Sequence, residues 1–483
     1  MAESRFADVL HERASRDPAA AAILCDGQAF TGQDLARRCD QFASFLVHEA
    51  GVRPGDRVAW LGANDPAQLV LLFALARIGA ILLPLNFRLA PPEWDAQLRL
   101  CTPGLLVHDE AWRDAAALLA QRHAIPAVPA TRLACEGPAA EERSRPDAPV
   151  LLVFTSGTTG APKAAVHTQS NLIANMQIAA RTQALTREDR VLTVLPLFHV
   201  GGLCIQTLPA LAAGAQVELH RRFAPTAVFE ALEQRRSTLT LQVPATMKAL
   251  IDHPRWHASD LSGLRALWAG SSLIPTPLVE AFHARGVPVC NVYGSTETGP
   301  FSIALGPQHA RTHVGSCGWP AAGVQARLGE GGEVLVRGPN VVGRYWPDEA
   351  ACDGEGWFHT GDLARQAADG SFTIDGRAKE LVISGGENIH PAEVEAALAL
   401  HEGVVECAAF GMPDREWGEV VAIAVVARGA DEAQLRAHLQ ARIARYKMPR
   451  RWYFVDSLPK TALGKVQRGA LARLAQAQQQ DER

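Results

Sequence analysis

The apolar residues of this chain fall into short blocks, which are separated by residues typical of turns. Residues 57–61 form a block of strand length, and residues 66–78 form a longer block that predicts a helix. Thr31, with Asp34 three residues later, predicts a further helix over residues 33–50 that is capped at Thr31. This alternation of helices and strands predicts an α/β fold with parallel strands.

The most apolar segment, residues 69–84, is interrupted by Arg77 and Gly79. It is too short to span a bilayer, so it predicts a buried helix followed by a strand and no membrane span. Residues 148–154 predict another buried strand, which leads into a polar loop.

Proline, glycine and charge mark the connections. Residues 121–150 hold five prolines and many charges, so we expect a mobile connection there, and the glycines of residues 329–343 predict a hairpin. The Gln-rich residues 475–483 are expected to fray. New α+β character begins after the long N-terminal part, so we expect a large domain of several subdomains over residues 1–376 and a small mobile α+β domain over residues 377–483.

Composition and charge exclude several classes of protein. A length of 483 residues favours two or more domains, and a hydrophobic content of 48% is ample for globular packing. A net charge of −4 gives no electrostatic footprint of nucleic-acid binding. The nine cysteines include no CxxC pair, and the first residues lack the apolar stretch of a signal peptide, so we expect a cytoplasmic protein with reduced thiols.

The most informative stretch is residues 154–163, which read Phe-Thr-Ser-Gly-Thr-Thr-Gly-Ala-Pro-Lys. Glycines let backbone N–H groups turn toward a ligand, hydroxyls donate hydrogen bonds, and a lysine adds a point charge, which together suit a polyphosphate. The candidate phosphate ligands are Thr155, Ser156, Gly157, Thr158, Thr159, Gly160 and Lys163. The alternative is a polar surface loop. Ala164 follows the lysine where a Walker loop needs Ser or Thr, so a P-loop kinase or GTPase is disfavoured.

A second segment, residues 291–297, reads Asn-Val-Tyr-Gly-Ser-Thr-Glu and follows a predicted strand over residues 287–292. The Tyr293 ring can stack on an adenine, and Thr296 offers a hydroxyl to a phosphate or a carboxylate. Glu297 supplies a hard oxygen ligand suited to Mg²⁺, which the lysine loop lacks. The alternative is a strand-end turn with a surface glutamate.

These two segments resemble the phosphate loop and the adenine and magnesium motif of the adenylate-forming superfamily, in its acyl-CoA synthetase and aryl-CoA ligase branch. Four further segments stand in the family's order, so the resemblance covers nearly the whole chain. By resemblance, two loops enclose the adenine: Gly270, Ser271 and Ser272 on one side, and Asn291, Val292, Tyr293, Gly294 and Ser295 on the other. Asp362 matches the carboxylate that pairs with the ribose hydroxyls, and Arg377 matches an arginine that also reaches the nucleotide.

The same resemblance implies a CoA site and a catalytic lysine. The loop Ser384, Gly385, Gly386 and Glu387 matches the lining of a pantetheine tunnel, where paired glycines let a thin chain pass. Trp417 resembles the segment near the CoA nucleotide, and Lys465 matches the lysine that bridges the substrate carboxylate and the α-phosphate. The alternatives are a glycine turn that opens a helix, a core tryptophan and a solvated basic face.

The acyl pocket is the least determined part of the site. His199, within Pro-Leu-Phe-His-Val-Gly-Gly, matches the position that gates this pocket, although a lone histidine in an apolar stretch is more often structural. No aspartate stands in this stretch to pair with an amino group, which disfavours amino-acid substrates. Val292 stands where malonate-activating relatives carry an arginine, which disfavours a dicarboxylate. We expect a compact aromatic acid of benzoate or hydroxycinnamate type, with a medium-chain fatty acid as the alternative.

The resemblance implies two half-reactions. A carboxylate attacks the α-phosphate of ATP, with Mg²⁺ as cofactor, and the thiol of CoA then displaces AMP from the acyl-adenylate. The C-terminal domain is expected to swing between them about a hinge that aligns with Lys379. Expected partners are the acid, ATP and CoA, with no nucleic acid, and a homodimer is one option for the oligomeric state. A carrier-protein thiol as acceptor, a luciferase-like oxygenase and a non-catalytic nucleotide-binding relative stay open.

Overall fold

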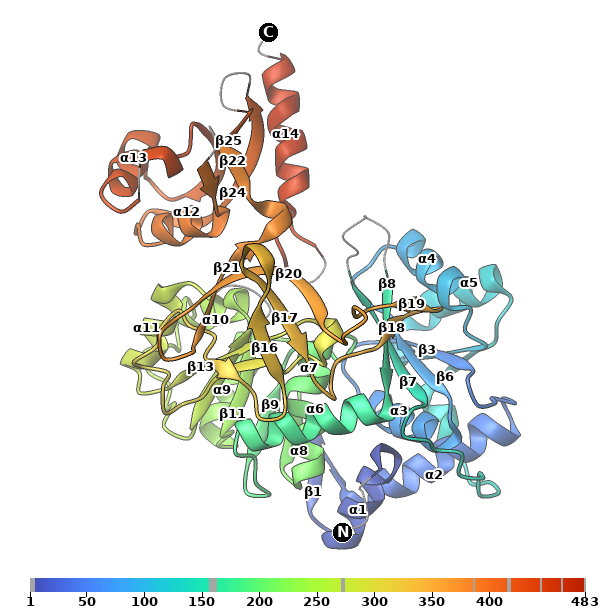
Figure 1. The fold of residues 1–483 in the computed structure, drawn as a ribbon. Coiled ribbons are helices and arrows are strands. Elements are labelled where there is room, and N and C mark those ends of the chain that lie inside the picture. The colour runs from blue at the N-terminus through green and yellow to red at the C-terminus, as the bar shows by residue number, and fades with distance from the viewer. Residues whose placement is uncertain are drawn as a thin grey trace.

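The structure is a computed structural model that describes residues 5–155, 163–270, 274–384, 387–414, 418–443, 445–461 and 464–481 (Figure 1). Its strands form four β-sheets. Two large sheets form the body of the N-terminal part, a four-stranded sheet adjoins them, and a five-stranded sheet belongs to the C-terminal part. Within the described residues, no helix combines the length and the apolar composition needed to cross a bilayer.

The nine-stranded sheet runs in the order β15-β14-β13-β12-β11-β9-β10-β1-β2, and its six central strands are parallel. Its strands are β1 (Ala21–Cys25), β2 (Gln28–Thr31), β9 (Arg190–Thr193), β10 (Gln216–Leu219), β11 (Leu239–Gln242), β12 (Ala266–Gly270), β13 (Val289–Tyr293), β14 (Ile303–Leu305) and β15 (Trp319–Pro320). Helices lie between consecutive parallel strands along the chain: α7 (Val200–Gly202) and α8 (Leu208–Ala213), then α9 (Pro225–Gln234), α10 (Pro244–Ile251) and α11 (Thr276–Ala284). Such crossover connections confirm the predicted parallel α/β character.

The eight-stranded sheet runs in the order β19-β18-β8-β7-β4-β3-β5-β6. Its strands are β3 (Arg57–Leu61), β4 (Ile81–Pro84), β5 (Leu105–His108), β6 (Ala127–Pro129), β7 (Pro149–Thr155), β8 (Lys163–Thr168), β18 (Arg344–Tyr345) and β19 (Glu349–Ala350). The helices of this part are α1 (Val9–Arg16), α2 (Gly32–His48), α3 (Pro66–Ile78), α4 (Pro91–Cys101), α5 (Arg113–His123) and α6 (Gln169–Thr182).

Helix α3 shows how the sequence sets the core. It begins at Asp65, whose carboxylate accepts a hydrogen bond of 2.7 Å from the Ala67 N–H, and it ends at Gly79, which has a φ of 73°. Every residue from Leu69 to Ala76 is at most 1% exposed. A helix that is apolar on all faces is stable only when it is enclosed, and α3 packs in the core that both large sheets share.

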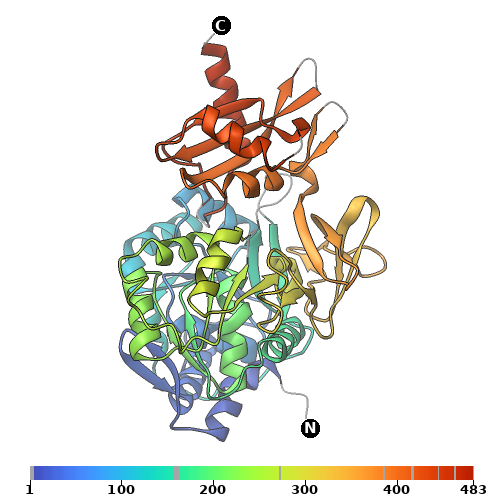
Figure 2. The same cartoon turned by 90° about the vertical axis from the view of Figure 1, so that its left-hand side faces the viewer.

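The four-stranded sheet contains β16 (Gln325–Leu328), β17 (Glu333–Arg337), β20 (Phe358–Gln366) and β21 (Phe372–Arg377), all antiparallel. The C-terminal sheet contains β22 (Val382–Ser384), β23 (Glu387–Ile389), β24 (Val404–Asp414), β25 (Gly418–Ala427) and β26 (Arg451–Phe454). It has a core on each face, one with α12 (Pro391–Leu398) and α13 (Glu432–Gln440), the other with α14 (Arg468–Asp481). Figures 1 and 2 show these C-terminal elements at one end of the molecule, next to β20 and β21.

Several sequence predictions are confirmed. The predicted strand over residues 57–61 and helix over residues 66–78 match β3 and α3, and α2 is capped at Thr31, whose side chain and Asp34 form a reciprocal capping box. A hairpin is present at the predicted glycines: the turn over residues 329–332 joins β16 and β17, although β16 lies just before the predicted range of residues 329–343.

Two predictions are wrong. Residues 121–150 are no loose connection: residues 127–129 add β6 to the sheet, and the Arg143 N–H donates to the Arg77 carbonyl at 2.7 Å. The C-terminal segment was expected to fray, but α14 continues through residue 481. Its Leu471 and Ala475, four residues apart on one helix face, are each 3% exposed because they pack on the sheet.

Candidate active site

The candidate phosphate loop lies between two paired strands. Thr155 ends β7 and Lys163 begins β8, and these residues pair directly across the antiparallel ladder. The predicted strand before the loop is therefore confirmed. Five candidate ligands lie outside the described residues: Ser156, Gly157, Thr158, Thr159 and Gly160.

Lys163 lies in a cluster of charged and aromatic side chains. Its ammonium group forms an ion pair with Glu349 and lies 5.1 Å from the centre of the Tyr345 ring. The Tyr345 hydroxyl donates a hydrogen bond of 3.0 Å to Oε1 of Glu297. The candidate phosphate lysine and the candidate magnesium carboxylate thus share one neighbour.

Thr296 and Glu297 lie in a short turn (Thr296–Thr298) after β13, where they are 7% and 8% exposed. The buried Asn340 side chain donates to the carbonyl oxygens of Thr298 and Phe301, which fixes this turn. Within the described residues, no group of three or more His, Cys, Asp or Glu residues could hold a metal ion. A single buried carboxylate still fits Mg²⁺, because Mg²⁺ is commonly held by one or two carboxylates together with substrate phosphates.

The predicted ribose site is built on a strand pair. Asp362 on β20 pairs with Arg377 on β21, and the Arg377 Nε donates to Asp362 Oδ1 at 2.8 Å. The Tyr293 hydroxyl donates to the other carboxylate oxygen, Oδ2, also at 2.8 Å. Burial raises the pKa of Asp362, and the charge of Arg377 opposes that rise. The hydrogen bond from Tyr293 to Asp362 was not expected from the sequence.

Lys465 reaches this same region from the C-terminal part. Partial burial lowers its pKa, as do the nearby charges of Arg377 and Arg468, whereas Glu380 and Asp362 raise it. The charges of Asp362 and Arg377 thus act on Lys465, although it lies 88 residues after Arg377 in the sequence.

Two glycines stand at close approaches in the candidate adenine loops. Gly270 ends β12 beside Val292, and a Cβ added to Gly270 would lie 3.1 Å from the Val292 Cγ1. A Cβ added to Gly294 would overlap the Pro300 carbonyl group. No other residue type fits these close approaches without movement of the backbone. Asn291 donates to the Ser316 carbonyl at 3.2 Å and Ser295 begins the turn, while Ser271 and Ser272 lie outside the described residues.

His199 caps a short helix (Val200–Gly202), and its Nδ1 accepts a hydrogen bond of 3.1 Å from the Gly201 N–H. Burial lowers the pKa of His199 to about 4, so the ring is neutral at physiological pH. Val292 is 3% exposed and Phe301 is fully buried. The expected pocket wall is thus uncharged at these positions.

The candidate CoA loop is only partly described. Ser384 ends β22, is 8% exposed, and pairs with Glu387 of β23 and with Gly418 of β25. Gly385, Gly386 and Trp417 lie outside the described residues.

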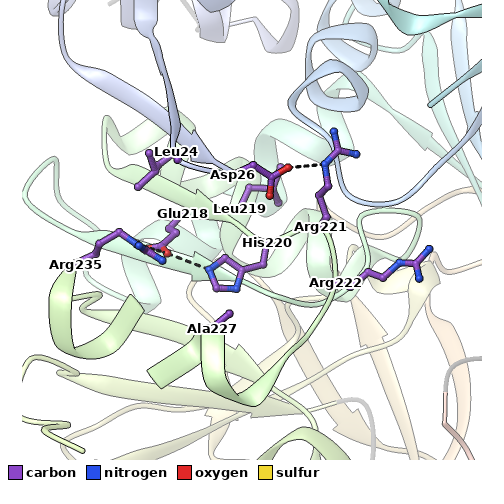
Figure 3. Close-up of a pocket in the computed structure, with 10 residues that line it drawn as sticks. Leu24, Asp26, Glu218, Leu219, His220, Arg221, Arg222, Ala227 and Arg235 are labelled. Carbon is purple, nitrogen blue, oxygen red and sulfur yellow. Dashed lines mark hydrogen bonds and ion pairs between the residues drawn. The ribbon is translucent and has the colours of Figure 1, made fainter. Parts of the chain in front are cut away.

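A separate cavity of about 260 Å³ lies at the carboxyl ends of β1 and β10 and shares no lining residue with the groups above. Figure 3 shows the buried Glu218 between His220 and Arg235, and Arg221 turned toward Asp26. Arg221 also pairs with Asp65 and Asp109, at 2.8 and 2.7 Å. Because these charged groups pair with one another, we interpret them as structural ion pairs that connect β1, β10, α3 and β5 around the cavity.

Comparisons with known proteins identify the family of this chain. The model of the AMP-binding enzyme family matches residues 10–346, and that of the AMP-binding enzyme C-terminal domain matches residues 393–465. The chain is 42% identical to an indoleacetate–CoA ligase of Aromatoleum aromaticum, over 96% of this chain and 97% of that protein. It is 41% identical to a feruloyl-CoA synthase of Amycolatopsis, over 95% and 97%. The solved o-succinylbenzoate–CoA synthetase of Bacillus subtilis, in complex with its acyl-adenylate intermediate, matches with a TM-score of 0.89 and 29% identity over 98% of each chain. The chain belongs to the family of AMP-binding enzymes.

Proposed function

We propose that this enzyme is an AMP-forming acid–thiol ligase. It converts a compact aromatic carboxylic acid, ATP and CoA to the acyl-CoA, AMP and pyrophosphate. The observation that carries the proposal is the convergence of Tyr293, Asp362, Arg377 and Lys465, from three parts of the chain, on one charged site. Two CoA ligases of aromatic acids with identities of 41–42% over nearly the whole chain support it.

In the first half-reaction, the acid attacks the α-phosphate and pyrophosphate leaves. We assign Asp362 to the ribose hydroxyls, and Thr155, Lys163 and Thr296 to the phosphates. Glu297 would hold Mg²⁺, which neutralises phosphate charge when it is bound. Lys465 stabilises the negative charge that develops between the carboxylate and the α-phosphate.

In the second half-reaction, the CoA thiol attacks the acyl-adenylate carbonyl and AMP leaves. We propose that the C-terminal domain turns at Lys379, with the boundary between residues 376 and 377, so that the loop of Ser384 to Glu387 replaces Lys465 at the site. Two observations support a movable junction. Only a short turn (Ala378–Glu380) connects β21 to β22, and a cavity of about 540 Å³ lies between β20, β21 and α12.

The acid specificity follows from the pocket wall. A neutral His199 and the buried Val292 offer no charge to a second carboxylate or to an amino group. An aromatic ring gains from burial against such apolar surfaces. The named substrates of the two relatives, indoleacetate and ferulate, are of this class.

Pyrophosphate release across a panel of carboxylic acids, with and without CoA, tests the proposal. Benzoates, hydroxycinnamates and indoleacetate should be active, with AMP as the nucleotide product. Octanoate, malonate and phenylalanine serve as the fatty-acid, dicarboxylate and amino-acid comparisons. Formation of ADP and phosphate in stoichiometric amounts would refute the assigned chemistry.

We also propose that the enzyme works in the cytoplasm. Its substrates ATP and CoA are abundant there, and all nine cysteines are free thiols in the structure.

A further inference from the structure

The strand register around the phosphate lysine brings three side chains to one face. Tyr345 of β18 pairs with Ala165 of β8 and, on its other side, with Glu349 of β19. Lys163 lies two residues before Ala165 on β8, so its side chain emerges on the same face as those of Tyr345 and Glu349. The contacts agree, because the Lys163 ammonium meets both the Tyr345 ring and the Glu349 carboxylate.

Tyr345 connects this lysine to the candidate magnesium carboxylate. Its hydroxyl donates to Glu297 at 3.0 Å, and its ring lies beneath the Lys163 ammonium. The Val342 N–H donates to the Glu297 carbonyl oxygen at 2.8 Å, so the segment that leads into β18 also holds the Glu297 backbone. Lys163 and Glu297 are therefore set relative to each other through a single side chain.

The ion pair between Lys163 and Glu349 is a weak one. The two side chains are 29% and 57% exposed, and pairs open to solvent to this degree contribute at most about 1 kcal/mol. The triphosphate of ATP carries several negative charges and forms stronger charge-assisted hydrogen bonds than one exposed carboxylate. An incoming triphosphate can thus take Lys163 from Glu349 at small cost.

We propose that Glu349 is the displaceable counter-ion of the phosphate lysine: it holds Lys163 over the Tyr345 ring in the empty site, gives it up to ATP, and takes it back as pyrophosphate leaves. Glu349 is then a positioning residue that sets how tightly the site holds polyphosphates. This inference rests on the proposed function, because it takes Lys163 as the lysine that meets the triphosphate. A nucleotide without β- and γ-phosphates should not compete with Glu349.

Calorimetric titration of ATP, pyrophosphate and AMP into the whole enzyme tests the proposal. In Glu349→Gln, the dissociation constants of ATP and pyrophosphate should fall by about two- to fivefold, the range expected for an exposed ion pair, while that of AMP stays unchanged. Asp348→Asn is the matched control. It removes the same charge one residue away, from a side chain that is 89% exposed and pairs with Arg344, and it should change none of the three constants.

A second arm tests whether the effect passes through the lysine. In a Lys163→Met background, Glu349→Gln should no longer tighten ATP or pyrophosphate. The proposal is overturned if Glu349→Gln leaves ATP binding unchanged or weakens it, if it shifts AMP by the same factor, or if the gain persists without Lys163. Wild-type enzyme that binds neither ATP nor AMP would overturn the proposed function itself, which separates the two failures.

Discussion

Removal of the Lys465 side chain should separate the two half-reactions. The charges of Asp362 and Arg377 both act on the pKa of Lys465, and we propose that this lysine serves adenylate formation. Lys465→Ala removes one cation from a developing negative charge. Loss of a single such group typically costs about 3–4 kcal/mol, or about 10²- to 10³-fold in rate. ATP-dependent pyrophosphate release should fall by that factor.

The thioester step should survive, because in the proposed mechanism it uses the loop of Ser384 to Glu387 and no longer needs Lys465. The assay supplies preformed acyl-adenylate and CoA and follows the thioester, in parallel with pyrophosphate release from ATP and acid. Lys460→Ala is the matched control: Lys460 lies on the same segment, pairs with Glu406 at 2.5 Å, and should affect neither step. Equal loss of both half-reactions in folded Lys465→Ala enzyme would refute the domain-rotation account.

Three further predictions concern other parts of the molecule. Val292→Gly should extend the range of accepted acids toward longer chains, because it removes a side chain that is 3% exposed from the expected pocket wall; an unchanged profile in the carboxylic-acid panel would place Val292 outside the pocket. Tyr345→Phe keeps the ring but deletes the hydrogen bond to Glu297. Loss of a hydrogen bond to a buried charge costs about 1.5–3 kcal/mol. Calorimetry should therefore show that MgATP binds at least about tenfold more weakly, while the binding of metal-free ATP changes little. Equal weakening of both would argue against Glu297 as the metal carboxylate. Burial lowers the pKa of His167 to about 4 from its ordinary 6.5. Between these pH values the unfolded chain binds a proton at this histidine and the folded chain does not. The stability that the neutral histidine contributes above pH 6.5 is therefore lost as the pH falls toward 4. In urea denaturation measured from pH 7 to 4, the unfolding free energy of His167→Phe should therefore fall less steeply with decreasing pH than that of the wild type. An equal dependence on pH would exclude His167 as the source of the loss.

Patterns of neighbouring residues predicted the helices and strands whose limits depend on contacts close in the sequence. The limits of β3 and α3 follow from apolar blocks and from the caps Asp65 and Gly79, which are all close in sequence. The strands before the candidate phosphate loop and in the candidate adenine motif could be placed from their apolar residues in the same way. Motif residues in family order then predicted which loops would face the nucleotide.

Features that depend on distant contacts could not be predicted. The prolines and charges of residues 121–150 indicated a loose connection, yet Gln41 donates to Glu136 at 2.7 Å and holds the segment against α2. Tyr345 and Glu349 stand about 180 residues after Lys163, and only the register of β8, β18 and β19 brings them together. The spacing of these residues in the sequence does not predict how the three strands pair.

The proposed site takes residues from all four parts of the fold, and this arrangement would let one nucleotide pocket serve two reactions. Lys163 comes from the eight-stranded sheet, Tyr293 from the nine-stranded sheet, and Asp362 with Arg377 from the four-stranded sheet. Lys465, by contrast, follows the strands of the C-terminal sheet. A turn of the C-terminal domain about residue 379 would withdraw Lys465 and leave the hydrogen bond from Tyr293 to Asp362, and the ion pair of Asp362 with Arg377, in place. On the proposed mechanism, the adenylate would therefore stay bound while the group that formed it is exchanged for the group that delivers the thiol. This requires that the chain turns at residue 379, so that Arg377, the last residue of β21, stays paired with Asp362.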